Sequence, residues 1–121
     1  MDRPAQPTSQ QEADLTQALE SLWVRFLPQI EERVAVLASA VSAVAEKRLT
    51  AAECEAAHSA AHKLAGVLAT FGLTRGTDLA RELETAFSGE AARVGSSVAN
   101  LAQSVTELRT LIENRRAAPA S

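Results

Sequence analysis

The sequence predicts an all-α fold, an antiparallel up-down four-helix bundle with an additional N-terminal helical segment. Apolar residues make up 46% of the 121 residues but aromatic residues only 3%, a composition that suits closely packed helices. Apolar residues also recur at spacings of three and four along most of the chain, as they do on one face of a helix. The connections between these periodic stretches are short, which favours antiparallel neighbours.

The chain divides into a lead, one domain and a tail. We expect residues 1–9 to be a disordered lead, because they contain Pro4 and Pro7 and no hydrophobic periodicity. Residues 10–116 then form the bundle, and residues 117–121 form a frayed tail. A chain of this size folds as one domain.

The N-terminal helical segment is interrupted by a proline. Its apolar stripe consists of Leu15, Leu19, Leu22, Trp23 and Phe26. Proline inside a helix removes a hydrogen bond and clashes with the preceding turn. Either a first helix ends near Leu27 and a second begins at Pro28, or one long helix kinks there. The stripe keeps its phase as far as Val44, which favours the kink or a very tight junction.

The next helix has clear signals at both ends. Thr50 and Glu53 have the spacing of a capping box, which predicts a helix start at Ala51. Its apolar face ends at Phe71, and Gly72 supplies the helix-ending residue.

Two further helices follow. Thr74 is a candidate N-cap for a helix that continues through Phe87, with an inner face of Gly76, Leu79, Ala80, Leu83 and Phe87. Ser88 and Gly89 predict a turn. The last helix is expected from about Glu90 to Arg115, with apolar residues at Val94, Val98, Leu101, Val105, Leu108 and Ile112.

Charge and composition exclude several classes of function. A net charge of −3 leaves no basic stripe for nucleic acid. The longest uncharged runs are too short to span a membrane, and the first residues lack the apolar core expected of a signal peptide. The single cysteine, Cys54, suits a reducing compartment. We therefore expect a cytoplasmic monomer.

The predicted second helix carries a histidine on an uncrowded face. Leu64, Leu68 and Phe71 lie on the core side, and His62 points roughly the opposite way, because two residues along a helix rotate the side chain by about 200°. Gly66 follows one turn later on the same face, at a cost of about 1 kcal/mol relative to alanine. The other neighbours predicted on this face are also small: Ser59, Ala65 and Ala69.

These residues resemble the histidine phosphotransfer (HPt) domain. The matching pattern is His62-x-Leu64-x-Gly66, followed by Phe-Gly with its glycine at Gly72, and by Leu-Glu at Leu83 and Glu84. It extends over about a fifth of the chain, and the helical layout extends the likeness to most of the remainder. HPt domains carry phosphate between receiver domains in multistep two-component signalling.

The resemblance implies a function for each part of the pattern. His62 is the phospho-acceptor, supported by the small residues around it. Leu64, Gly72, Leu83 and Glu84 belong to the structural motif. A neutral imidazole keeps a lone pair for attack on phosphorus.

The resemblance also implies the partners. The receiver domain supplies the acceptor aspartate, Mg²⁺ and the catalytic groups, and a hybrid sensor kinase is another expected partner. The chain has no ATP site and binds no metal of its own, so it is expected to be a phosphotransfer protein and not a kinase.

The sequence departs from the family pattern at two positions. The family commonly has a lysine three residues after the histidine, where this chain has Ala65; here Lys63 follows His62 directly. A lysine side chain is long enough to reach a phosphoryl group from that position. Gly76 replaces a leucine-like residue and predicts a close helix approach, beneath Phe71.

Two other readings remain open. The chain could be an interaction module that binds a receiver or kinase without passing phosphate, or, with less support, a structural or metal-binding bundle. Cys54, His58 and His62 share one helix face, but the outer two lie about 12 Å apart, too far for one ion. We therefore interpret His58 as a solvated helix residue and Cys54 as a small packing residue.

Overall fold

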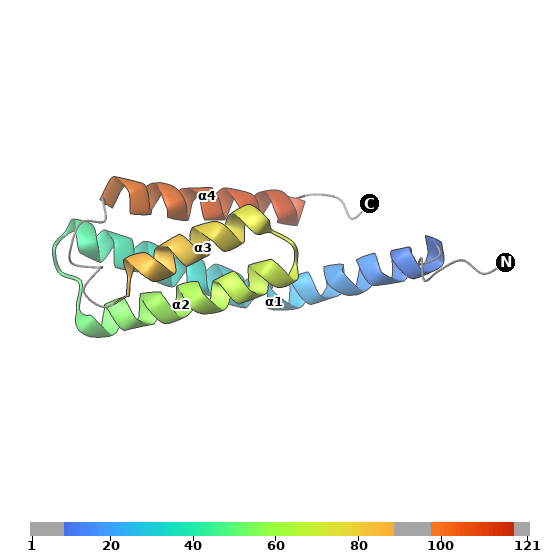
Figure 1. Cartoon of the computed structure of the whole chain (residues 1–121), viewed down its shortest axis with the longest axis horizontal. Helices are drawn as coiled ribbons and strands as arrows, with labels where there is room; N and C mark the ends of the chain where they lie inside the picture. Colours follow the sequence, from blue (N-terminus) through green and yellow to red (C-terminus); the bar gives the residue numbers. More distant parts are fainter. Residues whose placement is uncertain (1–8, 89–97, 118–121) are drawn as a thin grey trace.

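The structure, a computed structural model, describes residues 9–88 and 98–117. Within these residues the chain forms four helices and no strand. They are α1 (Ser9–Ala45), α2 (Ala51–Thr70), α3 (Thr74–Ala86) and α4 (Val98–Ala117). Consecutive helices run in opposite directions and pack side by side (Figure 1). The predicted all-α up-down bundle is confirmed.

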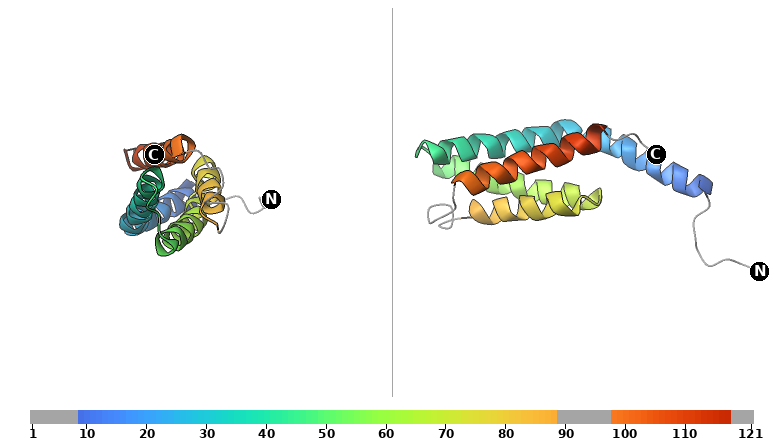
Figure 2. Two further views of the ribbon diagram at one scale, coloured as in Figure 1. Left: turned by 90° about the vertical axis from the view of Figure 1, so that its left-hand side faces the viewer. Right: turned by 90° about the horizontal axis from the view of Figure 1, so that it is seen from above.

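Helix α1 is one continuous helix that contains Pro28. This decides between the two alternatives for the N-terminal segment, since no break separates it from the bundle. The first part of α1 projects beyond the other three helices and changes direction where it leaves them (Figures 1 and 2). Its apolar side chains Leu15 and Val24 are 62% and 67% exposed. The additional N-terminal segment is therefore an extension of α1, and its last turns, with Trp23, Phe26 and Leu27, pack on the core.

The core is built from the predicted inner faces of all four helices. It contains many alanines, and these allow the helices to approach closely. Its fully buried large side chains are Trp23, Ile30, Leu37, Leu64, Leu68, Leu79, Leu83, Phe87 and Leu108.

Gly76 marks a close helix approach, as predicted, but its neighbours differ from the prediction. A Cβ atom at Gly76 would lie 3.1 Å from Leu68 Cδ1 on α2 and 3.8 Å from Leu108 Cδ2 on α4. The prediction that Gly76 lies beneath Phe71 is wrong, because the side chains of Leu68 and Leu108 fill the space above it.

Both predicted ends of α2 are confirmed to within a residue. The Thr50 hydroxyl accepts a hydrogen bond from the Glu53 N–H (3.0 Å), and the Glu53 carboxylate accepts one from the Thr50 N–H (2.9 Å). At the other end Gly72 has φ +73°, which a side chain would disfavour. The N–H groups of Gly72 and Leu73 then close the helix by donating to the carbonyls of Ala69 and Leu68.

The start of α3 differs from the prediction. Thr74 was expected to be its N-cap, but Thr74 is already helical and Leu73 occupies the cap position without a side-chain hydrogen bond. The Leu73 carbonyl instead accepts hydrogen bonds from the N–H (2.8 Å) and the hydroxyl (2.9 Å) of Thr77. The helix ends at Ala86, one residue before the predicted Phe87.

The remaining boundary predictions fall largely outside the described residues. These are the lead up to residue 8, Gly89, the start of the last helix at Glu90, Val94, and the tail from residue 118. The residues that can be compared are Ser9, which is helical; Ser88, which lies outside α3 in a bend; and Ala117, where α4 ends two residues later than predicted.

Candidate functional site

His62 lies in the middle of α2 on its exposed face. Its side chain is 72% exposed, whereas Ala61, Leu64 and Leu68 on the other side of the helix are fully buried. This is the arrangement predicted from the spacing of apolar residues in α2. A partner can therefore reach the imidazole without any change in the core.

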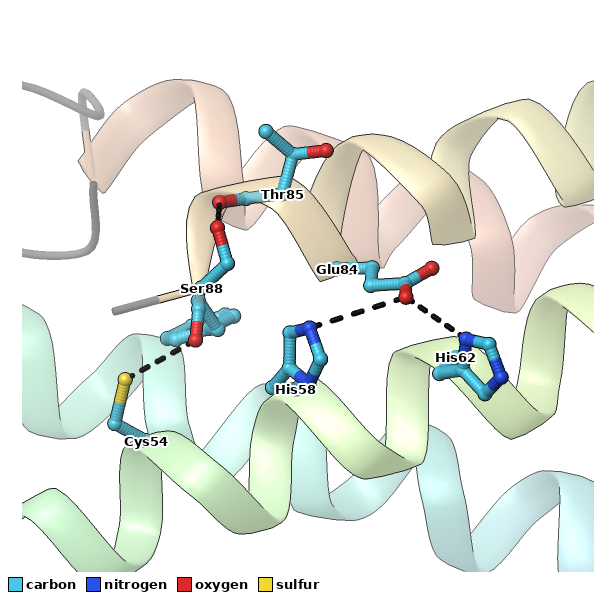
Figure 3. A network of polar contacts seen from close by, with 7 residues as sticks. Cys54, His58, His62, Glu84, Thr85 and Ser88 are labelled. Atoms are coloured by element: carbon cyan, nitrogen blue, oxygen red, sulfur yellow. Dashed lines mark hydrogen bonds and ion pairs between the residues drawn. The ribbon is translucent and has the colours of Figure 1, made fainter. Parts of the chain in front are cut away.

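The ring of His62 is held by a carboxylate from the neighbouring helix. Nδ1 of His62 lies 2.8 Å from Oε2 of Glu84 on α3 (Figure 3). Because a carboxylate only accepts hydrogen bonds, Nδ1 is the donor and carries the ring proton. Glu84 is itself only 25% exposed, so the contact is partly shielded from solvent.

This contact determines what the second ring nitrogen can do. In a neutral imidazole with its proton on Nδ1, Nε2 carries the lone pair. Nε2 points away from α3 (Figure 3), and among the described residues it has no hydrogen-bond partner. The site therefore presents a nucleophilic nitrogen in a fixed orientation on the surface of the bundle.

The sequence placed Glu84 only in the structural motif, so its contact with His62 was missed. The two residues are 22 positions apart and on different helices. Helical periodicity indicates which side of a helix is buried, but not which polar side chains meet across two helices. The one signal in the sequence for this contact was that Leu83 and Glu84 belong to the pattern that resembles HPt domains.

His58 shares the same carboxylate more loosely. Its Nε2 lies 3.8 Å from Glu84 Oε2, and its side chain is 41% exposed. That distance exceeds a hydrogen bond, so Glu84 is bonded to His62 and only near His58 (Figure 3). Cys54, one turn earlier, donates through Sγ to the Phe87 carbonyl at 3.3 Å. It is half-buried and packs at the α2–α3 contact.

The small residues around His62 are arranged partly as predicted. Gly66 is exposed, and a Cβ atom there would meet nothing within 4 Å. Ala69 is also exposed, and Ser59 is half-buried. Ala65 was predicted on the same face, but this is wrong: it is 5% exposed and belongs to the core. It follows the buried Ala61 by one turn of the helix, which places it on the inner side.

A hollow of about 400 Å³ adjoins His62 between α1 and α2. It is lined by Arg33, His62, Lys63, Gly66, Val67 and Thr70. Lys63 is exposed, as its predicted supporting role requires. Arg33 comes from α1 and was not singled out in the sequence, because nothing in the residues around it marks its position beside His62.

Clusters of metal-binding side chains and membrane-spanning helices were both sought among the described residues. Among them, no group of three or more His, Cys, Asp or Glu side chains is arranged to hold an ion. No helix in the part of the chain that the structure describes is both long and apolar enough to cross a bilayer.

Comparison with known proteins identifies the family. The Hpt domain family profile matches residues 21–118. The chain belongs to the Hpt domain family. It is 36% identical over 85 residues to Protein RcaC of Microchaete diplosiphon, a match that includes 69% of this chain and 13% of that protein. The chain thus spans a small part of the length of this relative. No solved structure matches it.

Membership of the Hpt family supports a general role in phosphorelay signalling through histidine phosphotransfer. Hpt domains are phosphotransfer modules without an ATP site of their own, and they interact with receiver domains and kinases. The exposed His62, bonded to Glu84 from α3, is the candidate residue for this role.

Proposed function

We propose that His62 accepts a phosphoryl group from the phospho-aspartate of a receiver domain, or from a sensor kinase, and passes it to another receiver. The observation that carries the proposal is the short contact between His62 Nδ1 and Glu84 Oε2. It keeps the proton on Nδ1 and leaves the lone pair on Nε2, at a side chain that is 72% exposed.

The transfer step follows from this geometry. The Nε2 lone pair attacks phosphorus, a P–N bond forms, and the P–O bond to the aspartate breaks. The aspartate leaves as a carboxylate with the electron pair of that bond. Because Nδ1 keeps its proton, the phosphorylated ring is positively charged, and the Glu84 carboxylate 2.8 Å away stabilises this charge.

The receiver completes the site. Phosphoryl transfer needs the donor and acceptor atoms in line and a metal ion to neutralise charge. We assign Mg²⁺ and the acceptor aspartate to the receiver, whose docking surface would be the face around His62 together with the adjoining surface of α1. A cytoplasmic location and a monomeric state belong to the same proposal.

Incubation with a phosphorylated receiver and Mg²⁺ tests the proposal. We expect acid-labile phosphate on this protein, lost in His62→Gln and retained in His58→Gln. The two histidines lie on one helix and share Glu84, so His58→Gln is a matched control. Absence of label on the wild-type protein, or its persistence in His62→Gln, would overturn the proposal.

One observation favours a second candidate. Ala65 takes the place of the lysine that the family commonly has there, which would suit a module that binds a receiver without accepting phosphate. That function predicts a stable complex with the receiver and no label on His62.

A further inference from the structure

We infer that Arg33, on α1, supplies the positive charge beside the phosphoryl group that the family usually places at the position of Ala65. The inference rests on the proposed function of His62. It assigns the hollow between α1 and α2 as the place where the phosphoryl group is held, with Arg33 as its anion-binding residue.

The position of Ala65 explains why the charge has to come from elsewhere. Ala65 is 5% exposed and packs in the hydrophobic core. A short apolar side chain suits that environment, whereas a cation there would have to extend out of the core to reach solvent. The surface beside His62 therefore receives no charge from this position of α2.

The hollow brings two cations to His62 from two helices. Lys63 lines it from α2 and Arg33 from α1, with Gly66 between them leaving space for a ligand. The hollow is shallow and open to solvent, so a phosphoryl group carried on the side chain of a docked partner can enter it. Two positive side chains and a histidine around one hollow favour an anion over any other ligand.

Arg33 is available for such a ligand. Elsewhere in the described chain, Arg48, Arg75 and Arg115 each bind a carboxylate within 3.1 Å. Arg33 has no ion pair among the same residues, as is also true of Arg25, Arg81 and Arg109, but those three are exposed whereas Arg33 is half-buried and lines the hollow. A partly shielded guanidinium with unused donors can bind two phosphoryl oxygens at once.

The orientation of His62 directs the phosphoryl group toward this hollow. Nδ1 is bonded to Glu84 on α3, and Nε2 points away from that helix (Figure 3). The hollow lies on the other side of His62, toward α1. Glu84 thus orients the ring from one side, and Arg33 neutralises the transferred group from the other.

Timed phosphotransfer with the full chain tests this assignment. The rate of labelling from a phosphorylated receiver with Mg²⁺ is measured over a range of receiver concentrations, which separates docking from transfer. We expect Arg33→Ala to lower the rate at saturating receiver about tenfold, the loss of one charge-assisted interaction. Arg33→Lys should restore most of it, because the charge is kept. Arg25→Ala, an exposed arginine on the same helix outside the hollow, should match the wild type.

The outcomes separate this inference from the proposed function. If wild-type protein takes no label, both are overturned. If it is labelled on His62 but Arg33→Ala transfers at the wild-type saturated rate, only the assignment of Arg33 is wrong; a change confined to the concentration at half-saturation would also contradict it. Should Arg33→Ala fail to fold, Arg33→Gln, which keeps the aliphatic stem, is measured against the same criteria.

Discussion

At the scale of single residues, the site depends on one hydrogen bond between two helices. Glu84 fixes the proton and the orientation of His62 through the 2.8 Å contact at Nδ1. Without that acceptor the exposed ring would rotate and exchange its proton between the two nitrogens. The imidazole would still be nucleophilic, but less often in the orientation that an approaching receiver requires.

Replacing Glu84 should therefore slow transfer without abolishing it. We expect Glu84→Ala to lower the transfer rate about tenfold, the effect of losing one hydrogen bond to a charged group. Glu84→Gln should lower it less, since the amide oxygen can still accept from Nδ1. The ¹⁵N shifts of the ring report the tautomer directly. Glu82→Ala, an exposed neighbour on α3, is the control; a tautomer unchanged in Glu84→Ala would contradict the assigned role.

Substitution of Gly66 should affect stability and phosphotransfer in opposite directions. A Cβ atom at this exposed helix position meets nothing within 4 Å, so Gly66→Ala should raise the free energy of unfolding by up to about 1 kcal/mol. The added methyl group would stand beside His62, where we propose that the receiver docks, and transfer should become slower. Urea unfolding and timed labelling measure the two effects; a variant that is both more stable and equally fast would show that the open space is not used.

The sequence predicted some of these residue positions and missed others for a physical reason. The exposure of His62 and Gly66 follows from rotation along one helix, which local spacing encodes. The contact of Glu84 with His62, and the place of Arg33 beside it, depend on how three helices pack, which local spacing does not encode. Ala65 was misplaced although its spacing of one turn from the core residue Ala61 already puts it on the inner side of the helix.

At the scale of the elements, the length of α2 is set by the residues at its two ends. The capping box at Thr50 and Glu53 and the left-handed Gly72 fix where the histidine helix begins and ends. Both were predictable, because each depends on residues only a few positions apart in the chain. The start of α3 was not: Thr77 binds the Leu73 carbonyl in place of a side-chain cap, and a threonine at the predicted cap position was misleading.

Thr50→Ala should destabilise the protein by about 1 kcal/mol, the usual contribution of an N-cap.

The Thr50→Ala substitution should also change the pH dependence of stability. Hydrogen bonding with Thr50, first through its backbone N–H and second through its side chain, lowers the pKa of the Glu53 carboxyl below its ordinary value of 4.5. A carboxyl whose pKa is lower in the folded than in the unfolded state stabilises the fold above pH 4.5. This stabilisation is lost as the pH falls through the pKa of the folded state. We expect the free energy of unfolding of the wild type, measured with urea, to fall as the pH drops below 4.5, and to fall less in the variant. Identical dependence of this free energy on pH in the two proteins would contradict this role of the cap.

At the scale of the whole molecule, one cluster joins three of the helices at the point where α1 leaves the bundle. Trp23 on α1 is 2% exposed and packs edge-on against Phe71 at 5.2 Å between ring centroids. The Arg115 guanidinium of α4 lies 5.0 Å from the Trp23 ring centroid and binds Glu20 at 2.7 Å. The sequence predicted the helices and their inner faces but not this junction, because its residues are far apart in the chain.

Trp23→Ala should lower the free energy of unfolding by about 3–5 kcal/mol, the range for removing a buried large aromatic side chain. The adjacent Val24 is 67% exposed, so Val24→Ala should change it by less than about 0.5 kcal/mol. Chemical denaturation followed by circular dichroism compares the two. If the two substitutions changed the free energy of unfolding equally, the packing at this end of the bundle would contribute little to its stability.

The identity of the phosphorylated nitrogen tests the central claim most directly. After transfer from a phosphorylated receiver, ³¹P–¹H correlation NMR distinguishes phosphate on the two nitrogens of an imidazole. The hydrogen bond from Nδ1 to Glu84 predicts phosphate on Nε2 of His62. Phosphate on Nδ1 of His62, or on His58, would contradict the account.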